Sequence, residues 1–451
     1  MANQINPVSR NLNIWPISGQ EFAALLTPLL NSDVRHISVA VSGGPDSLAL
    51  TWLLKRWCGN YGVGLSALTV DHHLRPSSGE EARKVSAWLK EWGLHHEVLN
   101  WHGEKPKTGI QEAARTKRYS LMLNWCHRNG IRDLFLAHHQ EDQAETFLLR
   151  LARSSGVDGL ACMRMITKRE GIRLLRPLLR VPKSRLYSTL EVHGLEWLED
   201  PSNSDPVFAR TIMKDLSLVL AVQGVEAPRL AALAGQFGHL RGRLEEVTSL
   251  VIDRAVTIHN AGWATIDHQF LMDLPDEVGS RVVIYMLRSI GGRPYPPPRS
   301  RLLRAINMIK NPGLRTAFTL GGCKVSELGN KLMILREEFR QTLPIKILTS
   351  GSVMWRGIFR CDFEPVSDGN PQALYLAPLG QKGWEQLVQD RPDIKKCGVL
   401  HAVGLTLPAL FGGHRVLMVP HINYCCNVDY AGRNPPNLKF VAAKFLPLEE
   451  R

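Results

Sequence analysis

The sequence predicts an α/β protein, a doubly wound parallel sheet followed by a helical middle domain and a small mixed C-terminal domain. Three observations predict this. Between residues 36 and 175, short apolar runs alternate with longer amphipathic segments, as in βαβ units. Beyond Lys214 the alternation stops, and apolar residues recur at helical spacing from Leu230 to Val251. The last hundred residues are rich in glycine, proline and short apolar runs. We therefore expect domains at 1–218, 219–340 and 341–451.

The composition is that of a globular chain with a basic balance. The 451 residues carry a formal charge of +13, which favours a polyanionic partner such as RNA, although many proteins carry solvated positive faces. No apolar run is long enough for a membrane span, and the N-terminus lacks a signal peptide pattern. None of the eight cysteines forms a C-x-x-C pair. We expect a reducing, cytoplasmic compartment.

The first predicted strand, 37–41, leads into a turn of small residues and then a helix. The turn is Ser42, Gly43, Gly44, Pro45, Asp46 and Ser47. Glycines let the backbone approach an anion, hydroxyls add donors, and the free amides of the helix start point toward the charge. We therefore predict a phosphate site, although an ordinary strand-to-helix turn shares this composition. Asp46 either orients the loop, binds Mg²⁺ or simply caps the helix.

The remaining elements follow in order. A lead-in helix is expected within 11–35. Further strands are predicted at 65–70, 96–101, 133–137 and 172–175, with helices at 78–92, 109–128 and 141–153 between them. Later helices are expected at 230–251, 279–290 and 299–310, and short strands at 316–320 and 331–335. Polar clusters then fall where strands end, at 71–75 and 138–142, which is where ligands sit in such sheets.

Individual residues in these clusters suit work on phosphates. Asp71 and His72 end one strand, and His138 and Asp142 follow another. Two adjacent histidines also suit a metal site, but no third ligand stands at a metal spacing. Arg115 and Arg118 share one face of a helix, where they either offset phosphate charge or form a solvated basic face. A basic run from Arg150 to Arg185 suggests a track for an RNA backbone.

Five motifs together resemble a known family. They are S-G-G-P-D-S at 42–47, V-D-H-H-L-R at 70–75, I-Q-E-A-A-R-T-K-R-Y at 110–119, A-H-H-Q-E-D-Q-A-E-T at 137–146, and E-D-P-S-N-S-D at 199–205. The first looks like the pyrophosphate loop of N-type ATP pyrophosphatases. The set, in this order over about 36–210, resembles the tRNA(Ile)-lysidine synthase family, and the fourth motif is the most specific.

The resemblance implies a reaction. ATP adenylates the C2 oxygen of the wobble cytidine in an isoleucine tRNA with a CAU anticodon, and free L-lysine then displaces AMP. Residues 42–47 would hold pyrophosphate with Mg²⁺, and Asp71 and His72 would lie near the adenosine. Asp46, Arg115, His138 and Asp142 would be catalytic. Lysine must attack as a neutral amine, although its free pKa is about 10.4; Glu141, Asp142 or a histidine is the candidate base.

The chain departs from the family pattern at three places. Glu141 stands where an aspartate is usual, Ser154 stands where a glycine is usual, and Ile212 replaces a common arginine. The C-terminal half resembles the family only loosely and would contact the acceptor stem. The alternatives are a tRNA thiolase, against which the cysteine spacing argues, a basic tRNA-binding protein without catalysis, and a small-molecule amidotransferase.

Overall fold

The computed structural model describes residues 14–75, 77–106, 108–199, 216–217, 219–293, 295–310, 317–338, 343–365, 373–426 and 438–446. The chain divides into two compact units, Met1–Gly242 and Arg243–Arg451. Within the described ranges, no helix is both long and apolar enough to cross a membrane.

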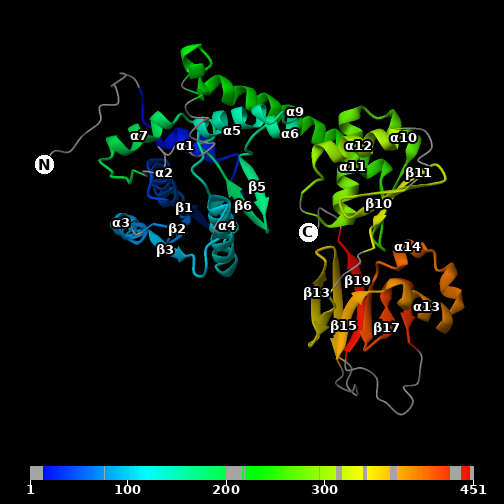
Figure 1. Cartoon of the computed structure of the whole chain (residues 1–451). Helices are drawn as coiled ribbons and strands as arrows, with labels where there is room; N and C mark the ends of the chain where they lie inside the picture. Colours follow the sequence, from blue (N-terminus) through cyan, green and yellow to red (C-terminus); the bar gives the residue numbers. More distant parts are fainter. Residues whose placement is uncertain are drawn as a thin grey trace. The chain divides into compact units, whose positions relative to one another are not determined.

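The N-terminal unit is built on a six-stranded sheet with the order β3-β2-β1-β4-β6-β5 (Figure 1). Its strands are β1 (His36–Ala40), β2 (Gly64–Asp71), β3 (His95–Asn100), β4 (Asp133–Phe135), β5 (Ile166–Arg169) and β6 (Ile172–Leu175). Neighbours from β3 to β6 pair in parallel, as the sequence predicts. The strand order reverses between β1 and β4, so the switch point of the sheet lies between these two strands.

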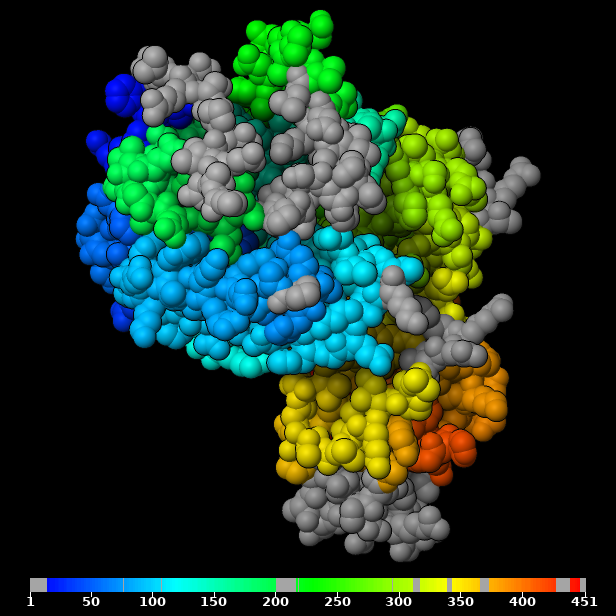
Figure 2. Space-filling model, turned by 60° about the vertical axis from the view of Figure 1, so that its left-hand side comes forward, coloured from blue at the N-terminus to red at the C-terminus, as the bar shows by residue number. Residues whose placement is uncertain are grey.

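Side chains alternate between the two faces of this sheet. Ile37 and Val39 of β1 belong to a core that includes residues of four helices, whereas Ala40 packs against a second core on the other face. The four helices are α1 (Gly19–Leu26), α2 (Pro45–Tyr61), α3 (Ser78–Glu91) and α7 (Lys183–Val192). The second core contains Tyr119, Met122 and Leu123 of α4 (Ile110–Arg128). The first half of this unit, coloured blue to cyan, lies on the face of the molecule that Figure 2 shows.

One edge of the sheet differs from the expected all-parallel arrangement. β5 pairs antiparallel with β6 through a two-residue turn, Glu170-Gly171. Both turn residues have positive φ, 50° and 78°, which matches the right-handed twist of a tight hairpin. No strand is predicted at 166–169, because three of its four residues are threonine, lysine and arginine and resemble a polar loop.

Two further helices of this unit carry the rest of its core. α5 (Gln140–Ala152) follows β4 and is succeeded by the short α6 (Val157–Leu160). Ala144, Phe147 and Leu148 of α5 form a small core with residues of α9 (Ala227–Ala255). The sequence periodicity therefore predicts α9 correctly, and the division between the two units falls within it.

The C-terminal unit combines helices with antiparallel sheets. Its helices are α10 (His268–Asp273), α11 (Asp276–Gly291), α12 (Arg299–Lys310), α13 (Gly380–Asp390) and α14 (His401–Gly404). A five-stranded sheet, in the order β7-β8-β11-β10-β9, accompanies the expected helices α11 and α12. Its strands are β7 (Thr257–His259), β8 (Trp263–Asp267), β9 (Phe318–Leu320), β10 (Cys323–Leu328) and β11 (Lys331–Arg336).

The last part of the chain forms two more sheets, with the orders β12-β15-β16-β17-β18 and β13-β14-β19. Their strands are β12 (Ile345–Ile347), β13 (Gly351–Trp355), β14 (Phe359–Pro365), β15 (Leu374–Pro378), β16 (Pro408–Gly412), β17 (Arg415–Val419), β18 (Tyr424–Cys425) and β19 (Leu438–Phe445). All pairs in these sheets are antiparallel. One core extends from α11 through these strands.

Candidate functional site

The glycine loop (residues 42–47) connects β1 to α2 and is ordered by its own hydroxyls. Ser47 Oγ donates to the carbonyl of Gly44 at 2.9 Å and accepts the Ser42 N–H at 3.1 Å. The Ser42 hydroxyl lies 3.2 Å from Ser47 Oγ. Pro45 occupies the first turn of α2, where its missing N–H costs no hydrogen bond. The loop is thus pre-shaped around the amino end of α2, as a phosphate site requires.

Both the backbone conformation at position 43 and the neighbouring side chains require a glycine there. Its φ is 86°, a conformation that side-chain-bearing residues rarely adopt. A Cβ atom there would lie 2.7 Å from a methyl group of Leu198 and from one of Val85. The Gly43 carbonyl also accepts the Leu198 N–H at 2.9 Å. The segment after α7 therefore fixes the loop from one side.

Asp46 stands in the first turn of α2 and meets two cations. Its Oδ2 atom lies 3.3 Å from Lys183 Nζ and 3.5 Å from His139 Nε2. Burial would raise the pKa of Asp46, but His139 and Lys183 lower it below its ordinary value. Its Oδ1 atom is buried and has no hydrogen-bond partner among the residues that the structure describes. Asp46 is therefore a carboxylate with one oxygen still available.

His139 joins the end of β4 to the glycine loop. It is the N-cap of α5, and Asp142 accepts its backbone N–H at 3.0 Å. Its ring nitrogens face carboxylates: Nδ1 is 3.0 Å from Glu141 and Nε2 is 3.5 Å from Asp142. Burial would lower the pKa of His139, but hydrogen bonds to Asp46 and Glu141 raise it to about 10. The buried imidazole is therefore charged at neutral pH.

Lys183, the first residue of α7, also belongs to this cluster. From the sequence alone we expect it only as part of the basic run. Its backbone N–H is shared between the two Glu141 oxygens, at 3.0 and 3.1 Å. Burial would lower the pKa of its ammonium, but Asp46 raises it above its ordinary value. One feature of the sequence could have indicated Lys183: a lysine begins this helix, and the first turn of the helix has no acidic residue.

The other predicted residues flank this cluster. His138 is half-buried between β4 and α5, beside His139. Asp71 ends β2 and is buried; it accepts the His73 N–H at 2.8 Å and faces the His73 ring at 3.3 Å. Burial and Arg118 lower the pKa of His72 below its ordinary value. The carboxyl ends of β1, β2 and β4 carry these groups, as the sequence predicts.

Arg115 and Arg118 lie on α4 around Tyr119, not among the carboxylates. Their guanidinium carbons lie 5.6 and 5.9 Å from the Tyr119 ring centre, and that of Arg169 lies 5.0 Å from it. Arg115 is exposed. The motif at 200–205, with Phe208, Arg210, Ile212 and Lys214, lies outside the described residues.

Three arginines of the basic run bind other groups within the protein. Arg173 makes two hydrogen bonds to Asp133, at 2.6 and 2.8 Å, and Arg185 makes two to Glu21, at 2.6 and 2.7 Å. Arg176 is buried and donates to a backbone carbonyl. These three arginines serve the fold, so a continuous phosphate track along the whole run is wrong. The exposed members are Arg150, Arg153, Arg164, Lys168 and Arg180.

A bound Mg²⁺ fits this site through a single carboxylate. Within the described ranges, no three His, Cys, Asp or Glu side chains gather as a metal site. Magnesium, however, is usually held by one or two carboxylates together with substrate phosphates. The buried Oδ1 of Asp46, next to the glycine loop, has the chemistry that such a ligand requires.

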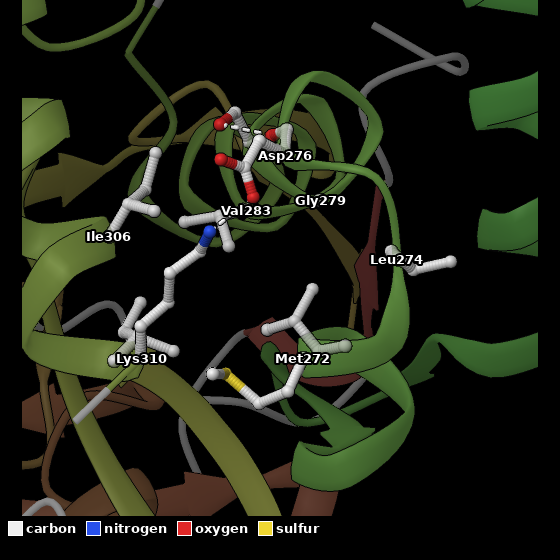
Figure 3. A pocket seen from close by; sticks show the side chains of 10 residues that line it. Met272, Leu274, Asp276, Gly279, Val283, Ile306 and Lys310 are labelled. Carbon is white, nitrogen blue, oxygen red and sulfur yellow. Dashed lines mark hydrogen bonds and ion pairs between the residues drawn. The ribbon is translucent and has the colours of Figure 1, made fainter. Parts of the chain in front are cut away.

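A pocket in the C-terminal unit has a different character (Figure 3). It is lined mainly by apolar side chains, among them Met272, Leu274 and Ile306. Its charged residues, Asp276 and Lys310, point toward each other and form an ion pair. These two charges therefore satisfy each other.

Comparisons with known proteins extend over both units. A family model described as a PP-loop domain matches residues 17–218. The tRNA(Ile)-lysidine synthase of Wolbachia pipientis wMel is 33% identical over 410 residues, which cover 90% of this chain and 93% of that protein. That of Ruegeria pomeroyi is 34% identical, covering 86% of this chain and 88% of that protein. That of a Bradyrhizobium species is 38% identical, covering 61% and 79%.

Proposed function

Because the chain belongs to the tRNA(Ile)-lysidine synthase family, we propose that the cluster around Asp46 is its catalytic centre. The protein is an ATP-using ligase that forms lysidine on an isoleucine tRNA. The observation that carries the location of the centre is the junction of the glycine loop with the group after β4. That junction lies at the switch point of the sheet, where open α/β sheets bind their ligands.

The first step in this proposal is adenylation of the tRNA. The loop amides and the hydroxyls of Ser42 and Ser47 bind the β- and γ-phosphates, which stabilises pyrophosphate as the leaving group. Asp46 would hold Mg²⁺, which would supply positive charge beside the phosphates. Asp71 and His72 lie near the adenosine. Arg115 approaches the α-phosphate while the C2 oxygen of the wobble cytidine attacks it.

The second step is attack by the ε-amine of free lysine at C2, which releases AMP. The amine must lose a proton before it can act as a nucleophile. His139 already carries its proton at neutral pH, so it cannot be the base. Glu141 is engaged by the His139 ring and by the Lys183 amide. We propose Asp142 or His138 for this role, although Asp142 also accepts the His139 N–H.

Residues 219–340 supply the proposed tRNA-binding surface. A pocket in this region is lined by Arg293, Arg301 and Tyr295, together with the three prolines at 296–298. Tyr295 is 79% exposed, so its ring is available to stack on a base. Two guanidinium groups next to an exposed aromatic ring suit an RNA backbone with an unpaired nucleotide. The N-terminal unit carries exposed arginines of its own.

A labelling experiment tests this function. The protein is incubated with ATP, Mg²⁺, radiolabelled lysine and an isoleucine tRNA with a CAU anticodon, and the label in the RNA is counted. A methionine tRNA with the same anticodon is the control. We expect label in the isoleucine tRNA and release of AMP and pyrophosphate. Pyrophosphate release without label would indicate another nucleophile, and tRNA binding without pyrophosphate would indicate a binding protein.

A further inference from the structure

The glycine loop has no basic side chain of its own. No lysine or arginine occurs between Arg35 and Lys55, and Lys55 lies over the ring of Trp52. Loops that hold nucleotide phosphates commonly add a lysine that reaches the β- and γ-phosphates. In this chain a basic side chain for those phosphates would have to come from another segment, because the backbone amides carry only partial charge.

Lys183 is the side chain that reaches the loop. Its ammonium lies 3.3 Å from Asp46 Oδ2, although the two residues are 137 positions apart. The backbone N–H of Lys183 is held by Glu141, which fixes the start of α7 next to the loop. The side chain is 34% exposed, whereas that of His139 is 7% exposed. Of these two cations on Asp46, only Lys183 has room to move.

Local helix physics does not explain a lysine at this position. A positive charge in the first turn of a helix opposes the helix dipole and costs about 0.3–1 kcal/mol. The first turn of α7 has no acidic residue that would offset the charge. A part-exposed ion pair with Asp46 returns only about 0–1 kcal/mol. The ammonium also lies 5.7 Å from the centre of the Tyr187 ring, a contact worth about 0.5–1 kcal/mol at an exposed site. These terms are all small, so we look for a role of the ammonium toward a ligand.

We propose that Lys183 is the phosphate-binding cation of the glycine loop and is exchanged between Asp46 and the β- and γ-phosphates of ATP. Without nucleotide, its ammonium occupies Asp46. When the nucleotide phosphates bind at the loop, the flexible four-carbon side chain turns from Asp46 to the phosphate oxygens, and the Asp46 carboxylate would then be left to hold Mg²⁺. His139 stays on Asp46 and keeps the carboxylate oriented. This inference rests on the proposed use of ATP at the loop.

Two binding measurements with opposite expected signs test the exchange. The variant is Lys183→Met, which keeps the backbone N–H to Glu141 and most of the side-chain volume. Removal of the ammonium should weaken binding of magnesium pyrophosphate by about tenfold or more, since a charge-assisted hydrogen bond is lost. It should also strengthen binding of Mn²⁺ alone, because a positive charge that lies 3.3 Å from Asp46 Oδ2 no longer repels the metal. Calorimetry measures the first and electron paramagnetic resonance the second.

The controls separate this role from a structural one. Lys90→Met removes an exposed lysine at the end of α3 and should change neither affinity. Lys183→Arg should restore most of the pyrophosphate affinity. Unchanged pyrophosphate affinity in Lys183→Met, or a fall in both affinities together with the melting temperature, would overturn the assignment of Lys183. A wild-type protein that binds no pyrophosphate would overturn both this assignment and the use of ATP at the loop.

Discussion

His139 Nε2 lies 3.5 Å from Asp46 Oδ2, and this contact joins the helix that follows β4 to the loop that follows β1. The imidazole is buried and charged, because the carboxylates of Asp46, Glu141 and Asp142 surround it. The two halves of the site are therefore held together by an ion pair at their centre. Its strength should depend on pH and on each partner.

The His139 ion pair should make stability pH-dependent. The pKa of His139 is raised from 6.5 to about 10 in the folded protein, so its contribution is fully present below pH 6.5 and is lost as the pH rises toward 10. His139→Gln should therefore lower the free energy of unfolding most at pH 6, and the difference from wild type should shrink by pH 10. Urea titrations at pH 6, 8 and 10 measure it.

His96→Asn is the control for that series. Burial lowers the pKa of His96 to about 4, so this imidazole is neutral in both states above pH 7. The difference in free energy of unfolding between His96→Asn and wild type should stay constant between pH 8 and pH 10. A His139→Gln difference that is equally constant would contradict a charged imidazole.

Asp142 should separate stability from chemistry. Asp142→Ala removes the acceptor of the His139 N–H and should cost about 1 kcal/mol of stability through the lost helix cap. Asp142→Asn keeps an oxygen that can accept this hydrogen bond but removes the charge. We expect Asp142→Asn to lose less stability than Asp142→Ala and yet to incorporate little lysine. Full labelling by Asp142→Asn would show that the charge of Asp142 has no part in the reaction.

Gly43→Ala should disrupt the glycine loop. The substitution combines positive φ with two contacts of 2.7 Å, and such overpacking typically costs about 1–3 kcal/mol. Gly93→Ala is matched, because Gly93 has a φ of 70° but nothing within 4 Å of an added Cβ. Denaturant midpoints and ATP affinity should both fall much further for Gly43→Ala. Equal losses in the two variants would assign the effect to backbone strain alone.

Ser154→Gly should stabilise the protein. Ser154 has a φ of 50° and stands where the family usually has glycine. A left-handed conformation costs about 1–2 kcal/mol for a residue with a side chain, of which the entropy of glycine offsets about 0.5–1 kcal/mol. A gain of up to about 1 kcal/mol is expected in the free energy of unfolding. Ser155→Gly, at a neighbour without positive φ, should show no gain.

Arg115→Ala should slow adenylation without changing the fold. Arg115 is exposed on α4, so its removal leaves no cavity. If its guanidinium stabilises charge on the α-phosphate, pyrophosphate release should fall by about a hundredfold. Arg128→Ala, exposed in the last turn of the same helix, is the control and should release pyrophosphate at the wild-type rate. Pyrophosphate release at the wild-type rate by Arg115→Ala would show that Arg115 has no part in adenylation.

The sequence predicts those parts of the site that follow one another along the chain. The glycine loop, Asp71 and the group from His138 to Asp142 each end a strand with a clear apolar pattern, so their placement at one edge of the sheet follows from topology. Lys183 could not be assigned this way, because its carboxylate partner comes from another βα unit. The antiparallel pairing of β5 also depends on a tertiary neighbour, since its residues are mostly polar.

The position of β4 next to β1 has a consequence for biogenesis. Residues 36–40 cannot meet their neighbours on that side until residues 133–135 exist, and Asp46 lacks its cations until Lys183 follows. Contacts this distant in sequence slow folding, because a long loop must close first. A ribosome-bound nascent chain that ends before β4 would thus expose the unpaired edge of β1, and the enzyme becomes competent only after most of its N-terminal unit has been synthesised.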